Sequence, residues 1–197
     1  MFGYVELELK DIATFTYGYS DTAKDSGDTR FIRITDINDN GHLKNEAKYI
    51  MLKEEAKKYL LSEGDLLMAR TGATYGKTLY YDCGEKSVYA SFLIKIAFDN
   101  CLLLNKYYWD FAQSQEYWRQ ANALASSGGQ PQFNANALGQ VKLKIPTIER
   151  QKRVCELLDE FDRLSNDMES GIPAEIEARQ KQYEYYRDKL LDFKRKD

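Results

Sequence analysis

The sequence predicts an α+β fold, in which a globular mixed α/β domain over residues 1–147 precedes long coiled-coil-forming helices over residues 148–197. Up to Pro146, short β-favouring runs punctuated by Gly, Asn and Asp alternate with segments of helical spacing. After Pro146 the apolar residues follow a seven-residue repeat instead. A chain of 197 residues is long enough for one domain of ordinary size plus a helical extension.

Within the first region, β-favouring runs predict strands at residues 30–37, 64–70, 78–82, 88–98 and 140–145. Apolar residues fall at helical spacing over residues 102–125, which predicts one or two helices there. Residues 54–63 are a second, shorter helix candidate.

After Pro146, two helical seams are expected on either side of a break at Gly171 and Pro173. The positions proposed for the seams are Val154, Leu157, Phe161, Leu164, Met168, Ile176, Tyr183, Tyr186 and Leu190. A helix cannot bury such a stripe alone, so each needs a partner helix. A second chain is the favoured partner, and packing within the chain is the alternative.

Composition excludes several classes of protein. The apolar runs are far shorter than the roughly 18–20 residues that span a bilayer, and no secretory signal is visible. The three cysteines are widely spaced, which favours a reducing cytoplasm over a disulfide framework or zinc site. The net charge of −3 means that any nucleic-acid contact must come from a local patch.

The stretch ARTGATYGKT, residues 69–78, resembles the phosphate-binding motif G-x-x-x-x-G-K-[ST] but does not match its spacing. Gly72 and Gly76 are separated by three residues rather than four, and the residues after Lys77 favour a strand over a helix. A nucleotide site is therefore not expected.

Two further near-matches also fail as sites. DINDNG, residues 36–41, opens like a calcium loop, but the twelfth position is Ala47 instead of a bidentate Glu. The single histidine, His42, could be a general base, although no nucleophile motif accompanies it. We expect no metal site and no catalytic centre.

The polar loops do carry side chains suited to DNA. Arg and Lys contact phosphates or guanine edges, while Gln and Asn pair with adenine. The candidate DNA-binding residues are Tyr17, Lys24, Arg30, Arg33, Arg70, Thr71, Thr74, Tyr75, Lys77, Gln130, Gln132 and Asn134. Taken one by one, each could equally be a solvated connector residue.

The C-terminal residues resemble a known family. GQVKLKIPTIERQKRVCELLDEFDRL and, more closely, GIPAEIEARQKQYEYYRDKLLDF resemble the conserved helical region of the specificity subunits of Type I restriction–modification systems. Upstream, VELELKDIATF, RITDINDNGH, EGDLLMARTGATYGKT and SSGGQPQFNANALGQVKLKIP resemble the target-recognition domain of the same subunits. The usual members carry two of each region, whereas this chain has one of each.

This resemblance implies a non-catalytic, cytoplasmic subunit that reads double-stranded DNA. Residues 1–147 would be the target-recognition domain, and residues 148–197 would serve dimerisation and methyltransferase docking, with Tyr185 and Arg187 as docking candidates. A homodimer would read one half-site per chain on an interrupted palindrome.

No cofactor is expected on the chain itself. S-adenosylmethionine would belong to an adenine methyltransferase subunit, and ATP and magnesium to a restriction subunit. The alternative is a coiled-coil assembly protein whose globular head binds another protein rather than DNA.

Overall fold

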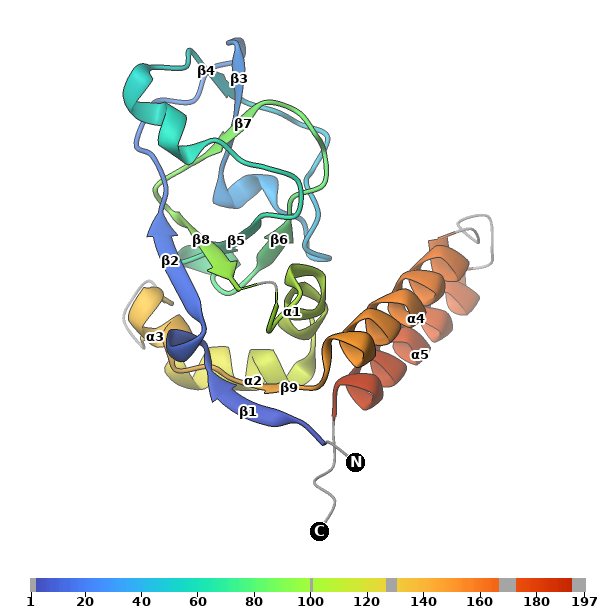
Figure 1. The fold of residues 1–197 in the computed structure, drawn as a ribbon. Coiled ribbons are helices and arrows are strands. Elements are labelled where there is room, and N and C mark those ends of the chain that lie inside the picture. Colours follow the sequence, from blue (N-terminus) through green and yellow to red (C-terminus); the bar gives the residue numbers. More distant parts are fainter. Residues whose placement is uncertain (1–2, 100, 127–130, 167–172, 193–197) are drawn as a thin grey trace.

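The computed structural model describes residues 3–99, 101–126, 131–166 and 173–192, except for the side chains of residues 163–166 and 173–177. A central sheet lies between a small lobe of strands and a layer of short helices, and two long helices extend to one side (Figure 1). The α+β prediction is confirmed.

The central sheet is antiparallel, in the order β2 (Ala13–Tyr17), β8 (Leu93–Phe98), β5 (Leu66–Ala69) and β6 (Thr78–Tyr80). Side chains along β5 alternate between two cores: Leu66 and Met68 join the core under the helices, whereas Leu67 and Ala69 join the core toward the lobe. Both faces of β5 are therefore covered, which explains its uninterrupted apolar run.

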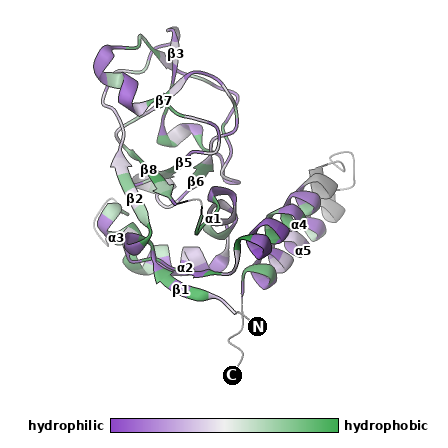
Figure 2. Ribbon diagram, in the orientation of Figure 1, coloured by the Kyte–Doolittle hydropathy of each residue, from purple (hydrophilic) through white to green (hydrophobic). Residues whose placement is uncertain are grey.

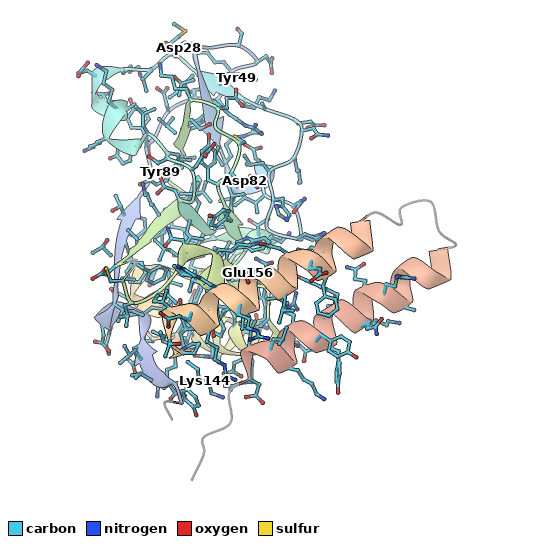
Figure 3. All side chains as sticks on the ribbon, turned by 45° about the vertical axis from the view of Figure 1, so that its right-hand side comes forward. Asp28, Tyr49, Asp82, Tyr89, Lys144 and Glu156 are labelled. Carbon is cyan, nitrogen blue, oxygen red and sulfur yellow. The ribbon has the colours of Figure 1, made fainter. Side chains whose placement is uncertain are left out.

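The lobe consists of β4 (Tyr49–Ile50), β3 (Thr29–Ile32) and β7 (Ser87–Tyr89), with β3 antiparallel to β4 and parallel to β7. Figure 3 shows Asp28 and Tyr49 at its far end and Tyr89 close to the central sheet.

The single strand predicted over residues 88–98 was wrong. A tight turn divides it into β7 and β8, where the amide of Leu93 donates to the carbonyl of Ala90 at 2.8 Å. The turn leaves the Phe92 side chain 50% exposed. The apolar run therefore contains one residue that belongs to neither core.

Beneath the sheet lie α1 (Asn105–Ala112) and α2 (Gln115–Leu124), so residues 102–125 form two helices. Ser114 separates them, and its hydroxyl accepts the Tyr117 amide at 3.2 Å as the N-cap of α2. Three buried side chains, those of Tyr107, Tyr108 and Tyr117, fill the space between these helices and the sheet.

The remaining elements are short. The helix α3 (Ala135–Gly139) and the antiparallel pair of β1 (Val5–Glu8) with β9 (Lys142–Ile145) complete the layer. Residues 54–63 contain a 3₁₀-helix rather than an α-helix. The 3₁₀-helices are η1 (Leu9–Asp11), η2 (Ile34–Asp36), η3 (Glu54–Tyr59) and η4 (Gly72–Thr74).

The long helices are α4 (Ile148–Asn166) and α5 (Pro173–Leu191), and they pack against each other within the chain (Figures 1 and 3). The rings of Phe161 and Tyr186 stack with centroids 5.6 Å apart and planes 3° apart. The partner helix that the seams require thus comes from the same chain, which was the less favoured alternative. None of the described helices has the length and apolarity to cross a membrane.

The helix α4 has two covered sides rather than one seam. Gln151, Cys155 and Leu158 are buried against the globular domain, whereas Phe161 faces α5 and Leu157 stays 36% exposed. In the parts of both helices that Figure 2 colours, hydrophilic and hydrophobic residues are interspersed. Among the predicted seam positions, Val154 is buried, Tyr183 and Leu190 are half-buried, and Met168 and the side chains of Leu164 and Ile176 lie outside the described parts.

Gln151 ties α4 to the globular domain. Its Oε1 accepts the amide of Leu104 at 2.9 Å, and its Nε2 donates to the carbonyls of Leu102 at 3.0 Å and Pro146 at 2.9 Å. The side chain is fully buried. One amide group therefore satisfies three backbone groups at the start of α1 and α4.

A cluster of three charged residues, of which Asp110 is buried, lies farther along the same contact. The ammonium of Lys106 on α1 is 2.8 Å from Asp159 on α4 and 3.7 Å from Asp110. Asp110 is 1% exposed, and burial raises its pKa to about 7 although Lys106 opposes the shift. Burial disfavours charge on Lys106 as well, but the two carboxylates outweigh it and raise its pKa.

Candidate nucleic-acid interface

The glycine-rich loop, residues 70–77, joins β5 to β6, and several of its backbone amides donate hydrogen bonds to carbonyls of the same chain. The amide of Gly76 donates to Ala69 at 2.8 Å, that of Tyr75 to Gly72 at 3.2 Å, and that of Gly72 to Pro131 at 3.2 Å. Gly76 has φ +82°, and a Cβ there would lie 3.0 Å from the Trp118 ring. A strand follows instead of a helix, so the loop lacks the helix dipole of a phosphate cradle, and these three amides are already bonded within the chain.

Arg70, the first residue of this loop, lies between two exposed aromatic rings. Its guanidinium carbon is 5.4 Å from the ring centroid of Tyr17 and 5.3 Å from that of Phe92. Its Nε donates to the carbonyl of Ser91 at 3.1 Å, which fixes the side chain. We call Tyr17, Arg70 and Phe92 the Arg70 cluster. Within the described parts of the chain, Arg70 forms no ion pair, so the cluster keeps a positive charge.

The segment that follows the 127–130 gap lies beside the Arg70 cluster. The Phe133 amide donates to the Arg70 carbonyl at 2.8 Å, and Thr71 forms a backbone bridge with Gln132. The hydroxyl of Tyr17 accepts the Ala135 amide at 3.2 Å. Gln132 is exposed, and its backbone is held next to Thr71, the residue that follows Arg70.

Other candidates from these segments have partners within the domain. Asn134 accepts the Ala137 amide at 3.0 Å as the N-cap of α3, although it remains exposed. Thr71 is 6% exposed, and the Thr74 hydroxyl donates to the Thr71 carbonyl at 3.5 Å. Gln130 lies outside the described residues.

The far end of the glycine-rich loop is held by other elements. The Tyr75 hydroxyl donates to Asn122 on α2 at 2.7 Å, and its ring meets that of Trp118 edge-on. Lys77 forms an ion pair with Asp39. Tyr75 and Lys77 therefore contact other residues than Arg70 does, and they do not belong to the Arg70 cluster.

The three cations predicted from residues 24–33 belong to the lobe. Arg30 is 8% exposed and donates to Glu85 at 3.2 Å and to the Lys44 carbonyl at 2.9 Å. Arg33 donates to Asp36 at 2.6 Å, and that hydrogen bond raises the pKa of Arg33. Lys24 is exposed and pairs through its backbone with Tyr49. Arg30 and Arg33 therefore hold the lobe together.

The residues of the failed calcium and enzyme motifs also serve the fold. The Asn38 Oδ1 accepts the amides of Asn40 and His42, both at 3.0 Å, which closes the turn. The His42 ring lies 5.1 Å from that of Trp109. The described residues contain no group of three or more side chains that could hold a metal ion.

The docking candidates on α5 differ in exposure. Tyr185 is 53% exposed and borders a cleft of 1020 Å³ between α5, α2 and β9. Arg187 is half-buried, with its guanidinium 5.6 Å from the ring of Tyr183. Only Tyr185 is presented for an outside contact. Lys144, which also lines the cleft, lies at the end of the molecule opposite the lobe (Figure 3).

Two residues that the sequence analysis did not single out matter here: Phe92 in the Arg70 cluster and Gln151 at the base of α4. Phe92 was concealed in a run that read as one strand. Gln151 stands in the helix start ERQKR, where a polar residue amid charged ones gives no sign of burial.

Comparison with known proteins places the chain in a family. The family model for the Type I restriction modification DNA specificity domain matches residues 1–178. A putative type I restriction enzyme specificity subunit of Haemophilus influenzae is 34% identical over 172 residues, which cover 85% of this chain and 42% of that protein. The EcoR124I/EcoR124II specificity subunit of Escherichia coli is 45% identical over 71 residues, 36% of this chain and 18% of that protein.

Solved structures share the fold. A chain of a type I R-M system complex superposes with a TM-score of 0.67 at 14% identity, covering 96% of this chain and 46% of that one. The HsdS subunit of Thermoanaerobacter tengcongensis gives a TM-score of 0.62 at 13% identity, covering 83% and 43%. The chain thus spans less than half the length of the proteins it matches. With its matched region extending from the first strand into α5, the chain belongs to the family of Type I restriction modification DNA specificity domains.

Proposed function

We propose that the chain is the sequence-reading, non-catalytic component of a Type I restriction–modification complex, with one DNA half-site read per chain. The Arg70 cluster carries the proposal, because it joins a guanidinium that has no ion-pair partner among the described residues to two exposed aromatic rings. The backbone of the exposed Gln132 pairs with the next residue, Thr71. Arginine and glutamine are the side chains that pair bidentately with guanine and adenine edges. Membership of the specificity-domain family supports the assignment.

The place of the cluster in the fold fits this role. The strand β2 and the helix α3, which border it, lie on the side of the molecule away from α4 and α5 (Figure 1). DNA on that side leaves the long helices free for other subunits. Residues 1–147 would therefore read DNA while residues 148–197 assemble the complex.

We assign two contacts to the helical region. Leu157 and Tyr186 remain 36% and 38% exposed after α4 and α5 have packed together, which leaves apolar surface for a second copy of the chain. Tyr185 and the cleft beside it would receive an adenine methyltransferase subunit. That subunit would bring S-adenosylmethionine, and a restriction subunit would bring ATP and magnesium.

A two-fold pair of chains would read an interrupted palindrome. Because α4 and α5 lie side by side, the helical region has the length of one 19-residue helix, about 28 Å. That length corresponds to roughly eight base pairs of DNA. The half-sites should therefore be separated by a spacer of several uncontacted base pairs.

The test is a binding-site selection from random duplex DNA, with the chain co-purified with the adenine methyltransferase of its own system. A split palindrome is the expected product, and it would give half-site and spacer together. Recovery of one unsplit sequence would refute the symmetric pair. Recovery of no sequence, with no salt-dependent duplex affinity, would favour an assembly protein that binds other proteins.

A further inference from the structure

The ring of Phe92 is an exposed apolar group in a constrained position. A single exposed hydrophobic side chain is ordinary in a soluble protein. Phe92 differs in its surroundings, because it lies 50% exposed beside a guanidinium and shares that cation with Tyr17, itself 43% exposed. Two open rings and a charge thus occupy one site at the ends of β2 and β5 and the start of β8.

The backbone around Phe92 is fixed from several directions. The amide of Arg70 donates to the Phe92 carbonyl at 3.0 Å, and the amide of Gly18 donates to the Leu93 carbonyl at 3.1 Å. The turn itself is closed by the bond from Leu93 to Ala90 at 2.8 Å. These contacts come from three strands, so the ring is presented from a rigid support.

Phe92 offers only an apolar ring to a ligand. It has no donor or acceptor, so it cannot read a base edge by hydrogen bonding. Its flat ring suits stacking on a base, and exposed aromatic rings beside arginine are the usual platform for unstacked bases. Phenylalanine also serves as a wedge between base steps in proteins that kink DNA.

We propose that Phe92 stacks on a base at a step that the protein unstacks, while Arg70 contacts the adjacent phosphate or base edge. Specificity at that step comes from the ease of distorting it rather than from hydrogen bonds. This proposal rests on the proposed function, since it assigns a specificity-determining residue within the same DNA-reading surface.

The experiment uses the full chain with its methyltransferase and compares the selected duplex with a random duplex. The variants are Phe92→Ala, Phe92→Leu and Phe92→Trp, with Leu102→Ala as control. Leu102 is an apolar residue of similar exposure, 39%, on the side that contacts α4. A 2-aminopurine scan of the selected duplex reports which step becomes unstacked, through a rise in fluorescence on binding.

Phe92→Ala and Phe92→Leu should each weaken binding of the selected duplex about ten-fold or more and abolish the fluorescence rise. Phe92→Trp should retain both, and Leu102→Ala should match the wild type. Random-duplex affinity should change by less than about two-fold in every variant, because that affinity comes from phosphates.

Full affinity in Phe92→Leu, an equal loss on both duplexes, or no fluorescence rise in the wild type would each overturn the stacking role. All three are read while the wild type still prefers the selected duplex, so they leave the proposed function standing. A wild type that binds both duplexes alike would overturn the proposed function and the stacking role together.

Discussion

The side chain of Arg70 illustrates how one residue can be both anchored and available. Its Nε is committed to the Ser91 carbonyl, while the rest of the guanidinium lies among aromatic rings without a carboxylate partner in the described chain. Arg30 and Arg33, by contrast, form ion pairs with Glu85 and Asp36. Residue type alone does not separate these three arginines, whereas their partners do.

Arg70→Ala should weaken binding of the selected duplex by about 1–3 kcal/mol and relax the sequence preference. If Arg70 contacts a phosphate as well, the slope of log K against log salt should decrease in size by about 0.9. Arg119→Ala is the control, because Arg119 is exposed on α2 and paired with Glu116 at 2.7 Å. Titrations at several salt concentrations measure both effects, and equal behaviour of the two variants would exclude Arg70 from the interface.

Gln151 stabilises the contact between α4 and the globular domain through its three hydrogen bonds. Gln151→Leu keeps the volume but leaves the amide of Leu104 and two carbonyls unpaired in the interior, which should lower the free energy of unfolding by about 2–4 kcal/mol. Gln180→Leu, an exposed change on α5, should alter it by less than about 0.5 kcal/mol. Urea unfolding curves of both variants distinguish these outcomes. Similar small losses in the two would mean that α4 is held mainly by its apolar contacts.

At the scale of elements, the contact between α1 and α4 combines apolar packing with buried charge. Asp110 is 1% exposed, and the ammonium of Lys106 lies 3.7 Å from its carboxyl group. Cys155 and Asp159 approach from α4, and burial raises the pKa of the Cys155 thiol. The protonated carboxyl of Asp110 is therefore the form that suits this contact best.

The stability of the chain should consequently fall with rising pH through this group. The pKa of Asp110 is about 7 when folded, above its ordinary value of 3.8, so its favourable contribution is complete below pH 3.8 and lost as pH passes 7. Asp110→Asn removes the titration. Its stability advantage over the wild type should grow by on the order of 2 kcal/mol between pH 5 and pH 8. Urea unfolding at both values measures the gap, and a constant gap would contradict the assignment.

The helices and strands also show which parts of the fold could be predicted from the sequence. Periodicity identified α1, α2 and the two long helices, and the apolar run of β5 stood out, because each element has one dominant period. The turn at Phe92 was missed because an apolar run does not record which residue leaves the core. The choice of arginines met the same difficulty. The sequence selected Arg70 and Arg30 alike, because only the fold decides that Glu85 pairs with Arg30 while no described carboxylate pairs with Arg70.

At the scale of the whole molecule, α4 and α5 bury only part of each other's apolar surface. Packing within the chain covers Phe161 and Val154, but Leu157, Tyr185 and Tyr186 keep 36%, 53% and 38% of their surface exposed. Leu157 and Tyr186 thus leave apolar surface open on an otherwise charged pair of helices, whereas Tyr185 borders the cleft assigned to the methyltransferase. In the proposed pair, a second copy of the chain would cover Leu157 and Tyr186, and the two recognition domains would then lie apart, as a split DNA site requires.

The pairing of chains can be tested with two lysine substitutions on neighbouring positions of α4. Leu157→Lys places an ammonium in the proposed contact and should convert a dimer to a monomer, because an unpaired charge is costly at an apolar interface. Glu156→Lys introduces the same side chain at the next, exposed position and should leave the dimer intact. Light scattering after gel filtration gives the mass, and circular dichroism verifies that both variants keep their helices.

The DNA affinity of these two variants tests the same pairing on the split palindrome. The monomeric Leu157→Lys variant should bind the split palindrome no better than a single half-site, because the gain from joining two weak contacts is lost. The Glu156→Lys variant should retain the difference between the two duplexes. A monomeric wild type that still prefers the split palindrome would contradict the symmetric pair, and the second recognition domain would then have to come from another chain.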